Sequence, residues 1–385
     1  MNLEHLLSDE VQSFIDKNAD VPVERFLLTK SPFPEVPISV MAGQIKGRKV
    51  AAKKFPFLLR EGVVFPPSLN LEQASSLATA RYKAKGLSGE TFTDLTCGFG
   101  IDAFFLSRHF KAVDLVERNA ELLSIVRHNW GVLGRGANFV SGDLLAYLEG
   151  LGQKRDLIYL DPARRDRLAN KVFLLEDLSP NLLEIESLLL AKGRRIMIKL
   201  SPLIDLAYLV NTLKSIGKIE VVAVKNEVKE LLVHLYPEEA VERVQCVGVN
   251  LETEEPDFSF FFGEEVLGRF GALEEYLYLP NNAVLKLGAF HLVAERFGLK
   301  KLHPNTHLYT SSVRREDFPG RVFRAQSIDA KHLKKGERYN IISKNHPLKP
   351  EAIKKKYKLK DGGSRYLIFT RGMEGTLILE ADPLP

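Results

Sequence analysis

Cysteine is scarce in this chain of 385 residues, because only Cys97 and Cys246 are present. Two cysteines exclude a disulfide framework, and neither they nor the scattered histidines have the spacing of a metal site. Long apolar runs are also absent, so no segment is expected to span a membrane, and residues 1–20 lack the apolar core of a signal peptide. We therefore expect a cytoplasmic protein with no bound metal and no membrane partner.

Repeats and low-complexity tracts are absent as well. The apolar fraction of 45% and the charged fraction of 27% are typical of a soluble globular protein. A chain of this length can form about two to four domains with substantial cores. The composition therefore agrees with an intracellular, multi-domain enzyme.

The most informative segment is a glycine turn. Residues 94–102 read DLTCGFGID and lie between an apolar strand expected at 91–95 and a helix expected at 101–109. Glycine lets the chain turn sharply, and it lets a ligand approach the bare backbone at the start of the helix. The turn predicts a binding site for a cofactor that contains a nucleoside.

Acidic side chains follow the next three expected strands. Glu117 ends the first of them, 19 residues after Gly98, where a carboxylate can accept two hydrogen bonds from the cis-diol of a ribose. Asp143 closes the next strand, where it can accept from the exocyclic amine of adenine, and Asp161 closes the last. The three strands are expected at residues 112–117, 138–140 and 156–160.

The glycines alone do not separate a dinucleotide site from a site for S-adenosylmethionine. The dinucleotide pattern G-x-G-x-x-G has Ala103 at its third glycine position, where alanine is sometimes allowed. Asp94 ahead of the glycines and the sequence DPAR at 161–164 favour S-adenosylmethionine, because methyltransferases carry Asp/Asn-Pro-Pro at that strand end. The alternative for residues 161–162 is a turn that merely starts a helix, since proline suits the first helical position.

Several segments together carry a resemblance to a known family. They are DLTCGFG at 94–100, DPARR at 161–165, EQASS at 72–76 with ARY at 80–82, PNTHLYT at 304–310, and the stretch at 357–370. They are similar to bacterial class I methyltransferases with a C-terminal THUMP-like domain, and the resemblance spans nearly the whole chain. It implies S-adenosylmethionine as the cofactor, but it names no substrate atom.

The expected fold class is α/β, with a Rossmann-like class I methyltransferase sheet, a helical N-terminal region and small α+β C-terminal domains. The expected divisions are a helical region at 1–88, a methyltransferase domain at 89–263, a small intermediate domain at 264–320, for which a ferredoxin-like fold is an option, and a basic THUMP-like domain at 321–385. Further strands are expected at 194–200, as a hairpin at 218–224 and 230–235, and as edge additions at 244–249 and 257–262. Helices are expected at 71–85 and 283–297.

The strand ends and the resemblance together define the candidate site. The candidate catalytic residues are Asp161, Pro162, Ala163 and Arg164. The residues expected to bind the cofactor are Asp94, Thr96, Cys97, Gly98, Gly100, Asp102, Glu117, Arg118, Asp143 and Asp161. The residues expected to contact RNA are Arg165, Lys354, Lys355, Lys356, Lys358 and Lys360.

The residues at the end of the fourth strand suit methylation of an exocyclic amine. Asp161 and the backbone carbonyls at 162–163 can accept hydrogen bonds from the N–H groups of such an amine. These hydrogen bonds relieve the positive charge that develops on nitrogen during transfer. Amine methylases more often have proline and then an aromatic ring where this chain has Ala163. The target base would therefore have to stack on Phe173 or Tyr159.

Methylation of pyrimidine C5 is the main competing chemistry, and it needs a cysteine that adds covalently to the base. Cys97 lies in the cofactor turn, and Cys246 follows the expected catalytic sheet. Neither lies in a loop after the fifth or sixth strand, so a nitrogen acceptor is favoured.

Charge is distributed unevenly along the chain. Residues 321–385 contain 15 Lys and Arg against 7 Asp and Glu, whereas the remainder contains 39 against 42. The basic tail indicates a partner that is a polyanion, and the densest cluster lies at 354–360. A solvated helix face is the alternative for this cluster.

A second basic segment, at 44–60, has six basic residues, no acid and two phenylalanines, Phe55 and Phe57. Basic and aromatic residues together suit a strand of nucleic acid. The alternative is that the rings belong to a small N-terminal core.

The sequence therefore predicts an S-adenosylmethionine-dependent methyltransferase that acts on a base nitrogen of tRNA or rRNA. The first alternative is a methyltransferase for a small molecule or a protein, with a tail that serves oligomerisation. The second is an RNA-binding protein whose cofactor site is vestigial.

Overall fold

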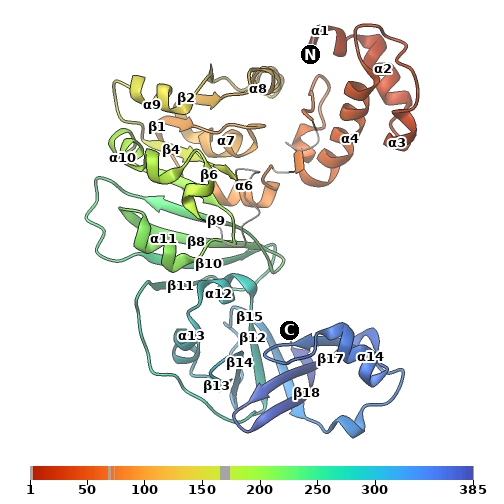
Figure 1. The fold of residues 1–385 in the computed structure, drawn as a ribbon, viewed down its shortest axis with the longest axis vertical. Helices are drawn as coiled ribbons and strands as arrows, with labels where there is room; N and C mark the ends of the chain where they lie inside the picture. Colours follow the sequence, from red (N-terminus) through yellow and green to blue (C-terminus); the bar gives the residue numbers. More distant parts are fainter. Residues whose placement is uncertain (1–2, 68–70, 73, 165–173, 385) are drawn as a thin grey trace. The chain divides into compact units, whose positions relative to one another are not determined.

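The computed structural model describes residues 3–67, 71–72, 74–164 and 174–384 (Figure 1). The chain divides into two compact units. The first contains Met1–Gly217 and Leu232–Val241, and the second contains Lys218–Leu231 and Glu242–Pro385. The candidate catalytic and cofactor residues belong to the first unit, and the C-terminal lysines belong to the second.

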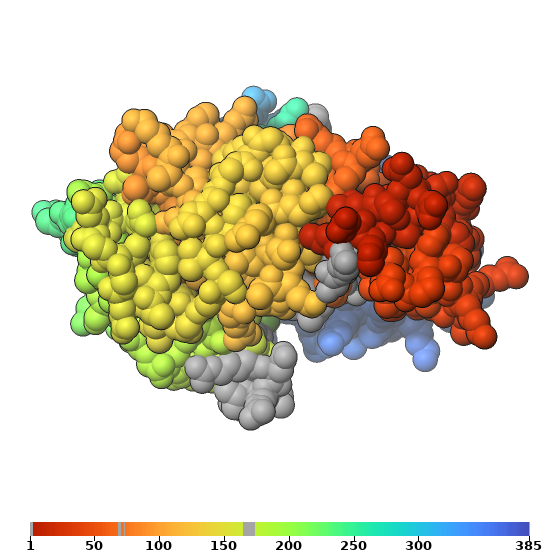
Figure 2. Space-filling model, turned by 90° about the horizontal axis from the view of Figure 1, so that it is seen from above, coloured from red at the N-terminus to blue at the C-terminus, as the bar shows by residue number. Residues whose placement is uncertain are grey.

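Helices form the N-terminal part of the first unit, as the sequence predicts. They are α1 (Leu3–Leu6), α2 (Asp9–Lys17), α3 (Val23–Phe26), α4 (Ile38–Lys54) and the 3₁₀ turn η1 (Pro56–Leu58). Their apolar side chains share one core with the strands β1 (Gly89–Asp94) and β2 (Phe110–Glu117) of the sheet. The side chain of Asn129 in α8 (Ala120–Val132) bonds both the amide and the carbonyl of Val64, at 2.8 and 2.7 Å. Figure 2 shows the red N-terminal surface meeting the orange and yellow surface of the residues that follow.

Five parallel strands form the centre of the first unit (Figure 1). They are β1 (Gly89–Asp94), β2 (Phe110–Glu117), β3 (Asn138–Ser141), β4 (Leu157–Leu160) and β7 (Ile196–Leu200). The helices that follow these strands are α7 (Ile101–Leu106), α8, α9 (Leu144–Gly150), α10 (Leu182–Lys192) and α11 (Leu206–Thr212). The carboxyl ends of parallel strands meet at one edge of the sheet, and α/β proteins bind ligands there.

A hairpin continues the sheet. Its strands are β8 (Ile216–Val224) and β9 (Glu227–Leu235), and both residues of the turn, Lys225 and Asn226, have positive φ, at 48° and 68°. Positive φ at both positions is typical of the type I′ turn that joins antiparallel strands. The strand order is β11-β10-β8-β9-β7-β4-β1-β2-β3, with β10 (Gln245–Leu251) and β11 (Phe258–Phe261) at one edge. The predicted hairpin and edge strands are confirmed.

The second unit contains a sheet of its own, with the order β13-β14-β12-β15-β18-β17-β16. Its strands are β12 (Tyr276–Pro280), β13 (Lys300–His303), β14 (Thr306–Ser311), β15 (Gly320–Ser327), β16 (Arg338–Ser343), β17 (Lys360–Gly372) and β18 (Gly375–Leu384). Because β12 pairs with β15, the strands before and after residue 320 belong to one sheet. The basic helix α14 (Pro350–Tyr357) connects β16 and β17 (Figure 1).

Two predicted helices differ from the structure. The helix expected at 71–85 is α6 (Leu77–Lys83), which begins after Ser76 because the Ser76 hydroxyl accepts a bond from the Thr79 amide at 3.2 Å. The helix expected at 283–297 is two helices, α12 (Asn282–Leu287) and α13 (Phe290–Phe297). Gly288 ends the first of these in the left-handed conformation, with φ of 76°.

Candidate active site

The glycine turn connects β1 to α7 in a tight conformation. Gly98 and Gly100 have φ of 53° and 74°, which side-chain-bearing residues rarely adopt. A Cβ atom at Gly100 would lie 2.9 Å from Cγ1 of Val126 and 3.1 Å from Nε1 of Trp130. The turn therefore lies close against α8, and its backbone is fixed where the strands end.

Asp94 lies below the turn and is 1% exposed. Its Oδ1 accepts a hydrogen bond from the Thr96 amide at 2.9 Å. Burial raises the pKa of Asp94 well above its usual range, although the Thr96 amide opposes this shift. A buried carboxyl of this kind is costly to the fold, and such groups concentrate at functional sites.

Glu117 joins the end of β2 to the glycine turn. Its Oε2 accepts from the Gly98 amide at 2.9 Å, and its Oε1 accepts from the Asn119 amide at 2.9 Å. Two backbone bonds fix the carboxylate, and each oxygen keeps a further lone pair for a ribose diol. Arg118, the next residue, is exposed.

Asp143 closes β3 and caps α9. It is exposed, and its Oδ1 accepts from the amides of Leu145 and Ala146 at 2.8 and 3.4 Å. The Gly142 amide donates to the Glu117 carbonyl at 3.2 Å, so the ends of β2 and β3 are adjacent. Local N-capping therefore explains part of this acid's position.

Asp161 lies where β4 ends, and it contacts two other segments. Its backbone amide donates to Oγ1 of Thr96 at 2.7 Å, which links β4 to the glycine turn. Its Oδ2 accepts a hydrogen bond from Nζ of Lys199, at the end of β7. The structure therefore brings together Asp94, Thr96, Gly98, Glu117 and Asp161 at one edge of the sheet.

The segment after Asp161 is a short strand. Ala163 and Arg164 form β5 (Ala163–Arg164), which pairs antiparallel with β6 (Leu178–Ser179). The alternative in which residues 161–162 start a helix is therefore wrong, because the chain extends into a ladder instead. Arg165 and Phe173 lie outside the described residues.

A buried polar network beneath this edge was not predicted as a unit. Lys83 of α6 is 3% exposed, and its Nζ lies 3.2 Å from Oδ1 of Asp102 and 3.1 Å from Oγ of Ser75. Oδ2 of Asp102 accepts from Ser75 Oγ and from the hydroxyl of Tyr159, both at 2.7 Å. Lys199 Nζ lies 3.7 Å from the same oxygen of Asp102.

The electrostatics of this network are balanced. Burial acts to raise the pKa of Asp102, but the ammonium groups of Lys83 and Lys199 outweigh it and lower that pKa to about 2. Sequence reasoning missed Lys83 and Ser75 because both precede the sheet. The only available signal was the similarity of the segments at 72–76 and 80–82 to the family.

Tyr159 is excluded as the ring that stacks on a target base. It is 1% exposed within β4, and its hydroxyl donates to Asp102. Alternation along the strand directs this side chain into the core, so the expectation for Tyr159 is wrong.

Neither cysteine has the character of a nucleophile. Burial raises the pKa of the Cys97 thiol well above its usual value and raises that of Cys246 to about 12. Within the described ranges, no group of three or more His, Cys, Asp and Glu side chains is arranged to hold a metal ion. The described helices also include none that is both long and apolar enough to cross a membrane.

The predicted basic segments are partly neutralised. Nζ of Lys354 lies 2.5 Å from Asp361 and 2.6 Å from Glu351. Of the other candidate lysines of the tail, Lys355 and Lys356 belong to α14, Lys358 follows it directly, and Lys360 begins β17.

In the N-terminal segment at 44–60, Phe55 is fully buried, and Phe57 stacks on Phe104 with ring centroids 5.4 Å apart. The rings are therefore core contacts, but their core is shared with the sheet and is not the separate N-terminal core of the alternative. Of the basic residues there, Lys46 pairs with Glu72 at 3.0 Å and Arg48 pairs with Asp16.

Comparison with known proteins identifies two C-terminal domains and a relative of similar length. A family model of a ferredoxin-like domain matches residues 276–319, and a THUMP domain-like model matches residues 320–382. A solved structure from Porphyromonas gingivalis W83, described as a "putative methyltransferase", is 32% identical, with 99% of each chain covered and a TM-score of 0.88.

Two curated proteins from strains of Mycobacterium tuberculosis are also similar. Each is named an uncharacterised S-adenosylmethionine-dependent methyltransferase and is 28% identical over 242 residues. The match covers 61% of this chain and 62% of each relative, so this chain spans less than two thirds of their length.

The donor set at the sheet edge fits the cofactor of these relatives. A fixed carboxylate for a diol, an exposed acid at the end of the third strand and a glycine turn are the groups that a nucleoside needs. The fold class and the resemblance found in the sequence are confirmed. The chain belongs to the S-adenosylmethionine-dependent methyltransferases with a C-terminal THUMP-like domain, a family whose cofactor is S-adenosylmethionine.

Proposed function

We propose that this chain transfers a methyl group from S-adenosylmethionine to a base nitrogen of tRNA or rRNA. The observation that carries the proposal is the position of Asp161. Its carboxylate lies at the end of β4, beside the cofactor turn, and Lys199 holds one of its oxygens. A carboxylate there can accept the N–H bonds of an acceptor amine.

Cofactor binding is assigned to the glycine turn and to the acids around it. Glu117 accepts hydrogen bonds from the ribose hydroxyls, and Asp143 accepts a hydrogen bond from the exocyclic amine of adenine. Asp94 and the backbone at Thr96, Gly98 and Gly100 contact the amino acid part of the cofactor. Cys97, Asp102 and Arg118 remain predictions for this role, and the contacts of Asp102 favour a structural one. For Asp161, a role at the acceptor is proposed in place of the predicted cofactor role.

When bound, S-adenosylmethionine supplies an already activated methyl group, so the protein mainly has to align the acceptor. Asp161 accepts a hydrogen bond from one N–H group of the amine. This contact directs the nitrogen lone pair away from the carboxylate. The backbone carbonyls of Pro162 and Ala163 can accept a hydrogen bond from the second N–H group. Arg164 and Arg165 follow directly and are proposed to contact a flanking phosphate.

The RNA substrate is supported by the composition of the tail and by its family. The THUMP-like match covers 320–382, which is also the basic part of the chain. Lys354, Lys355, Lys356, Lys358 and Lys360 are proposed to contact the RNA backbone, although Lys354 is already paired. We also propose a cytoplasmic location and divisions of the chain at residues 88, 263 and 320, as the sequence predicts.

The test is methyl transfer from radiolabelled S-adenosylmethionine into total RNA from a strain that lacks this protein, with RNA from the parent strain as the control. We expect label only in the RNA of the deletion strain, because parent RNA is already methylated. Size fractionation then separates tRNA from rRNA, and nucleoside mass spectrometry identifies the methylated atom. If the protein binds the cofactor but labels no RNA, a small molecule or a protein becomes the favoured substrate.

A further inference from the structure

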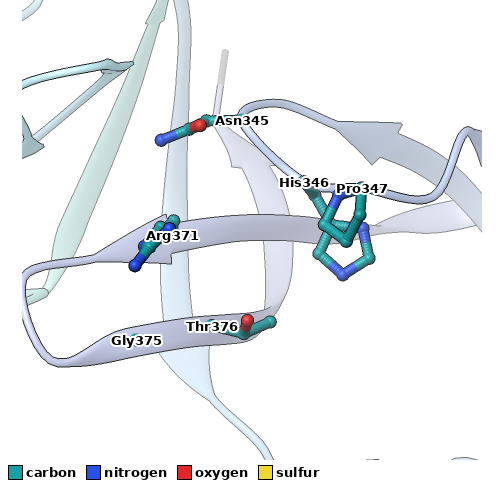
Figure 3. Close-up of a pocket in the computed structure, with 6 residues that line it drawn as sticks. All are labelled: Asn345, His346, Pro347, Arg371, Gly375 and Thr376. Carbon is teal, nitrogen blue, oxygen red and sulfur yellow. The ribbon is translucent and has the colours of Figure 1, made fainter.

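Two groups of polar side chains lie outside the strand ends that form the candidate site. One lines a hollow of about 610 Å³ in the second unit, which Figure 3 shows between the β17–β18 hairpin and the loop that follows β16. Of its six lining residues, Arg371 alone carries a fixed charge, and its side chain is exposed. The other group is the buried network around Asp102 in the first unit, where several contacts hold each charge.

Ser75 lies at the centre of this buried network. It is 8% exposed and belongs to the segment at 72–76, which precedes α6. Its Oγ donates to Oδ2 of Asp102 at 2.7 Å, and it accepts from Nζ of Lys83 at 3.1 Å and from Nζ of Lys199 at 3.3 Å. A hydroxyl has one donor and two acceptor sites, so these three contacts determine its orientation.

Lys199 lies between two carboxylates. Its Nζ contacts Oδ2 of Asp161 and is 3.7 Å from Oδ2 of Asp102. The second separation is too long for a hydrogen bond from an ammonium to a carboxylate, which measures about 2.7–2.9 Å. Lys199 therefore bonds the candidate catalytic carboxylate, although another carboxylate lies within its reach.

The reason for this choice of partner is that Oδ2 of Asp102 is already occupied. It accepts from the hydroxyls of Ser75 and Tyr159, both at 2.7 Å. A carboxylate oxygen has about two lone-pair sites, so two neutral donors fill them. The hydroxyls of Ser75 and Tyr159 therefore keep the ammonium of Lys199 on Asp161.

The position of the Asp161 carboxylate matters because it is proposed to accept a hydrogen bond from the acceptor amine. Lys199 contacts Oδ2, so the other carboxylate oxygen can face the acceptor. A small displacement of a group that aligns reactants is costly to the rate. Whatever holds Lys199 in place therefore affects transfer.

We propose that Ser75 is a positioning residue for methyl transfer. Its hydroxyl occupies Oδ2 of Asp102 and holds the ammonium of Lys199 on Asp161, so a segment that precedes the sheet fixes the carboxylate at the acceptor. The proposal rests on the proposed role of Asp161. It also gives a physical role to the segment at 72–76, whose similarity to the family is visible in the sequence.

The test measures methyl transfer by the full-length variant Ser75→Ala into RNA from the deletion strain. Without the hydroxyl, Lys199 is free to move toward Asp102, so we expect kcat to fall about tenfold while the KM for S-adenosylmethionine is nearly unchanged. Ser75→Thr keeps a hydroxyl and should recover part of kcat. Ser76→Ala is the matched control, because Ser76 caps α6 through the Thr79 amide. It should lower the thermal unfolding temperature slightly and leave kcat unchanged.

A double-substitution cycle separates positioning from a general effect on the fold. If Ser75 acts through Lys199, the variant Ser75→Ala with Lys199→Met should be no slower than Lys199→Met alone. A further loss of about tenfold in the double variant would overturn the proposal, since Ser75 would then act independently of Lys199. An unchanged kcat in Ser75→Ala, or an equal loss in Ser76→Ala, would overturn it as well.

Crystal structures of the wild type and of Ser75→Ala give a second readout, which needs no acceptor. We expect Nζ of Lys199 to leave Asp161 in the variant and to come within hydrogen-bond distance of Oδ2 of Asp102. An unchanged contact between Lys199 and Asp161 contradicts the proposal. If the wild type labels no RNA, the proposed substrate is wrong, and the two crystal structures alone decide whether Ser75 holds Lys199 on Asp161.

Discussion

The ammonium group of Lys199 contacts Oδ2 of Asp161 and connects this catalytic candidate to the buried network around Asp102. Asp161 is therefore tied to a neighbouring strand through Lys199, although it lies at a strand end. This arrangement yields separate predictions for transfer, positioning and stability.

Removing the Asp161 carboxylate should abolish methyl transfer and leave cofactor affinity nearly unchanged. The reason is that this group is proposed to contact the acceptor amine, whereas Glu117 and the glycine turn hold the cofactor. Single-turnover labelling of RNA and calorimetric titration with S-adenosylmethionine measure the two properties in Asp161→Ala. Full activity in this variant would remove Asp161 from the mechanism.

Lys199→Met should lower the rate of transfer by up to about 100-fold, since small displacements of a group that aligns reactants are costly. Lys199→Arg keeps the charge and should recover part of the rate. Cofactor affinity should change little in either variant, so the effect appears in kcat rather than in the KM for S-adenosylmethionine. Equal kcat values for the Met variant and the wild type would show that Lys199 does not position Asp161.

Lys83→Met should destabilise the fold by about 3–5 kcal/mol, because it leaves the buried Asp102 carboxylate without its closest cation. Chemical denaturation measures this loss. The second substitution Asp102→Asn should recover part of it, since no buried charge then remains unpaired. Lys111→Met is the control, because the Lys111–Glu90 pair is exposed and should contribute almost nothing. A stable Lys83→Met protein would contradict the assignment of this network to the core.

Asp94→Asn should raise stability at neutral pH and weaken cofactor binding about tenfold or more. The pKa of Asp94 is higher in the folded state than in the unfolded state. As the pH falls, the Asp94 carboxyl is therefore protonated in the folded protein before it is protonated in the unfolded chain. The wild type therefore loses stability as the pH rises through that interval, and its deficit relative to Asp94→Asn shrinks on acidification. Thermal unfolding at several pH values measures the difference.

Asp156→Asn should change stability in the direction opposite to Asp94→Asn. Burial acts to raise the pKa of Asp156, but the amides of Thr91 and Glu90 outweigh it and lower that pKa. Its contribution is present above the unfolded pKa and is lost as the pH falls, so Asp156→Asn should reduce stability at neutral pH. If the variants at both positions changed stability in the same direction, the assignment of these shifts would be wrong.

The order of elements in the catalytic sheet could be predicted because each strand ends in a local signal. Gly98 and Gly100 mark the turn after β1, and Glu117, Asp143 and Asp161 mark the next strand ends. The boundaries of the helices were harder to predict from the sequence. Gly288 divides a helical pattern that the apolar periodicity continues across, and the Ser76 side chain fixes the start of α6.

The sequence by itself determined the sheet, the glycine turn and the family, because these depend on short segments whose chemistry is local. Only the tertiary structure decided which charges meet. Lys83, Ser75 and Lys199 gather on Asp102 from three separate segments, and Lys354 is neutralised by Glu351 and Asp361. Pairing of charges depends on distances of a few ångströms between residues far apart in the chain, and no local pattern records those distances.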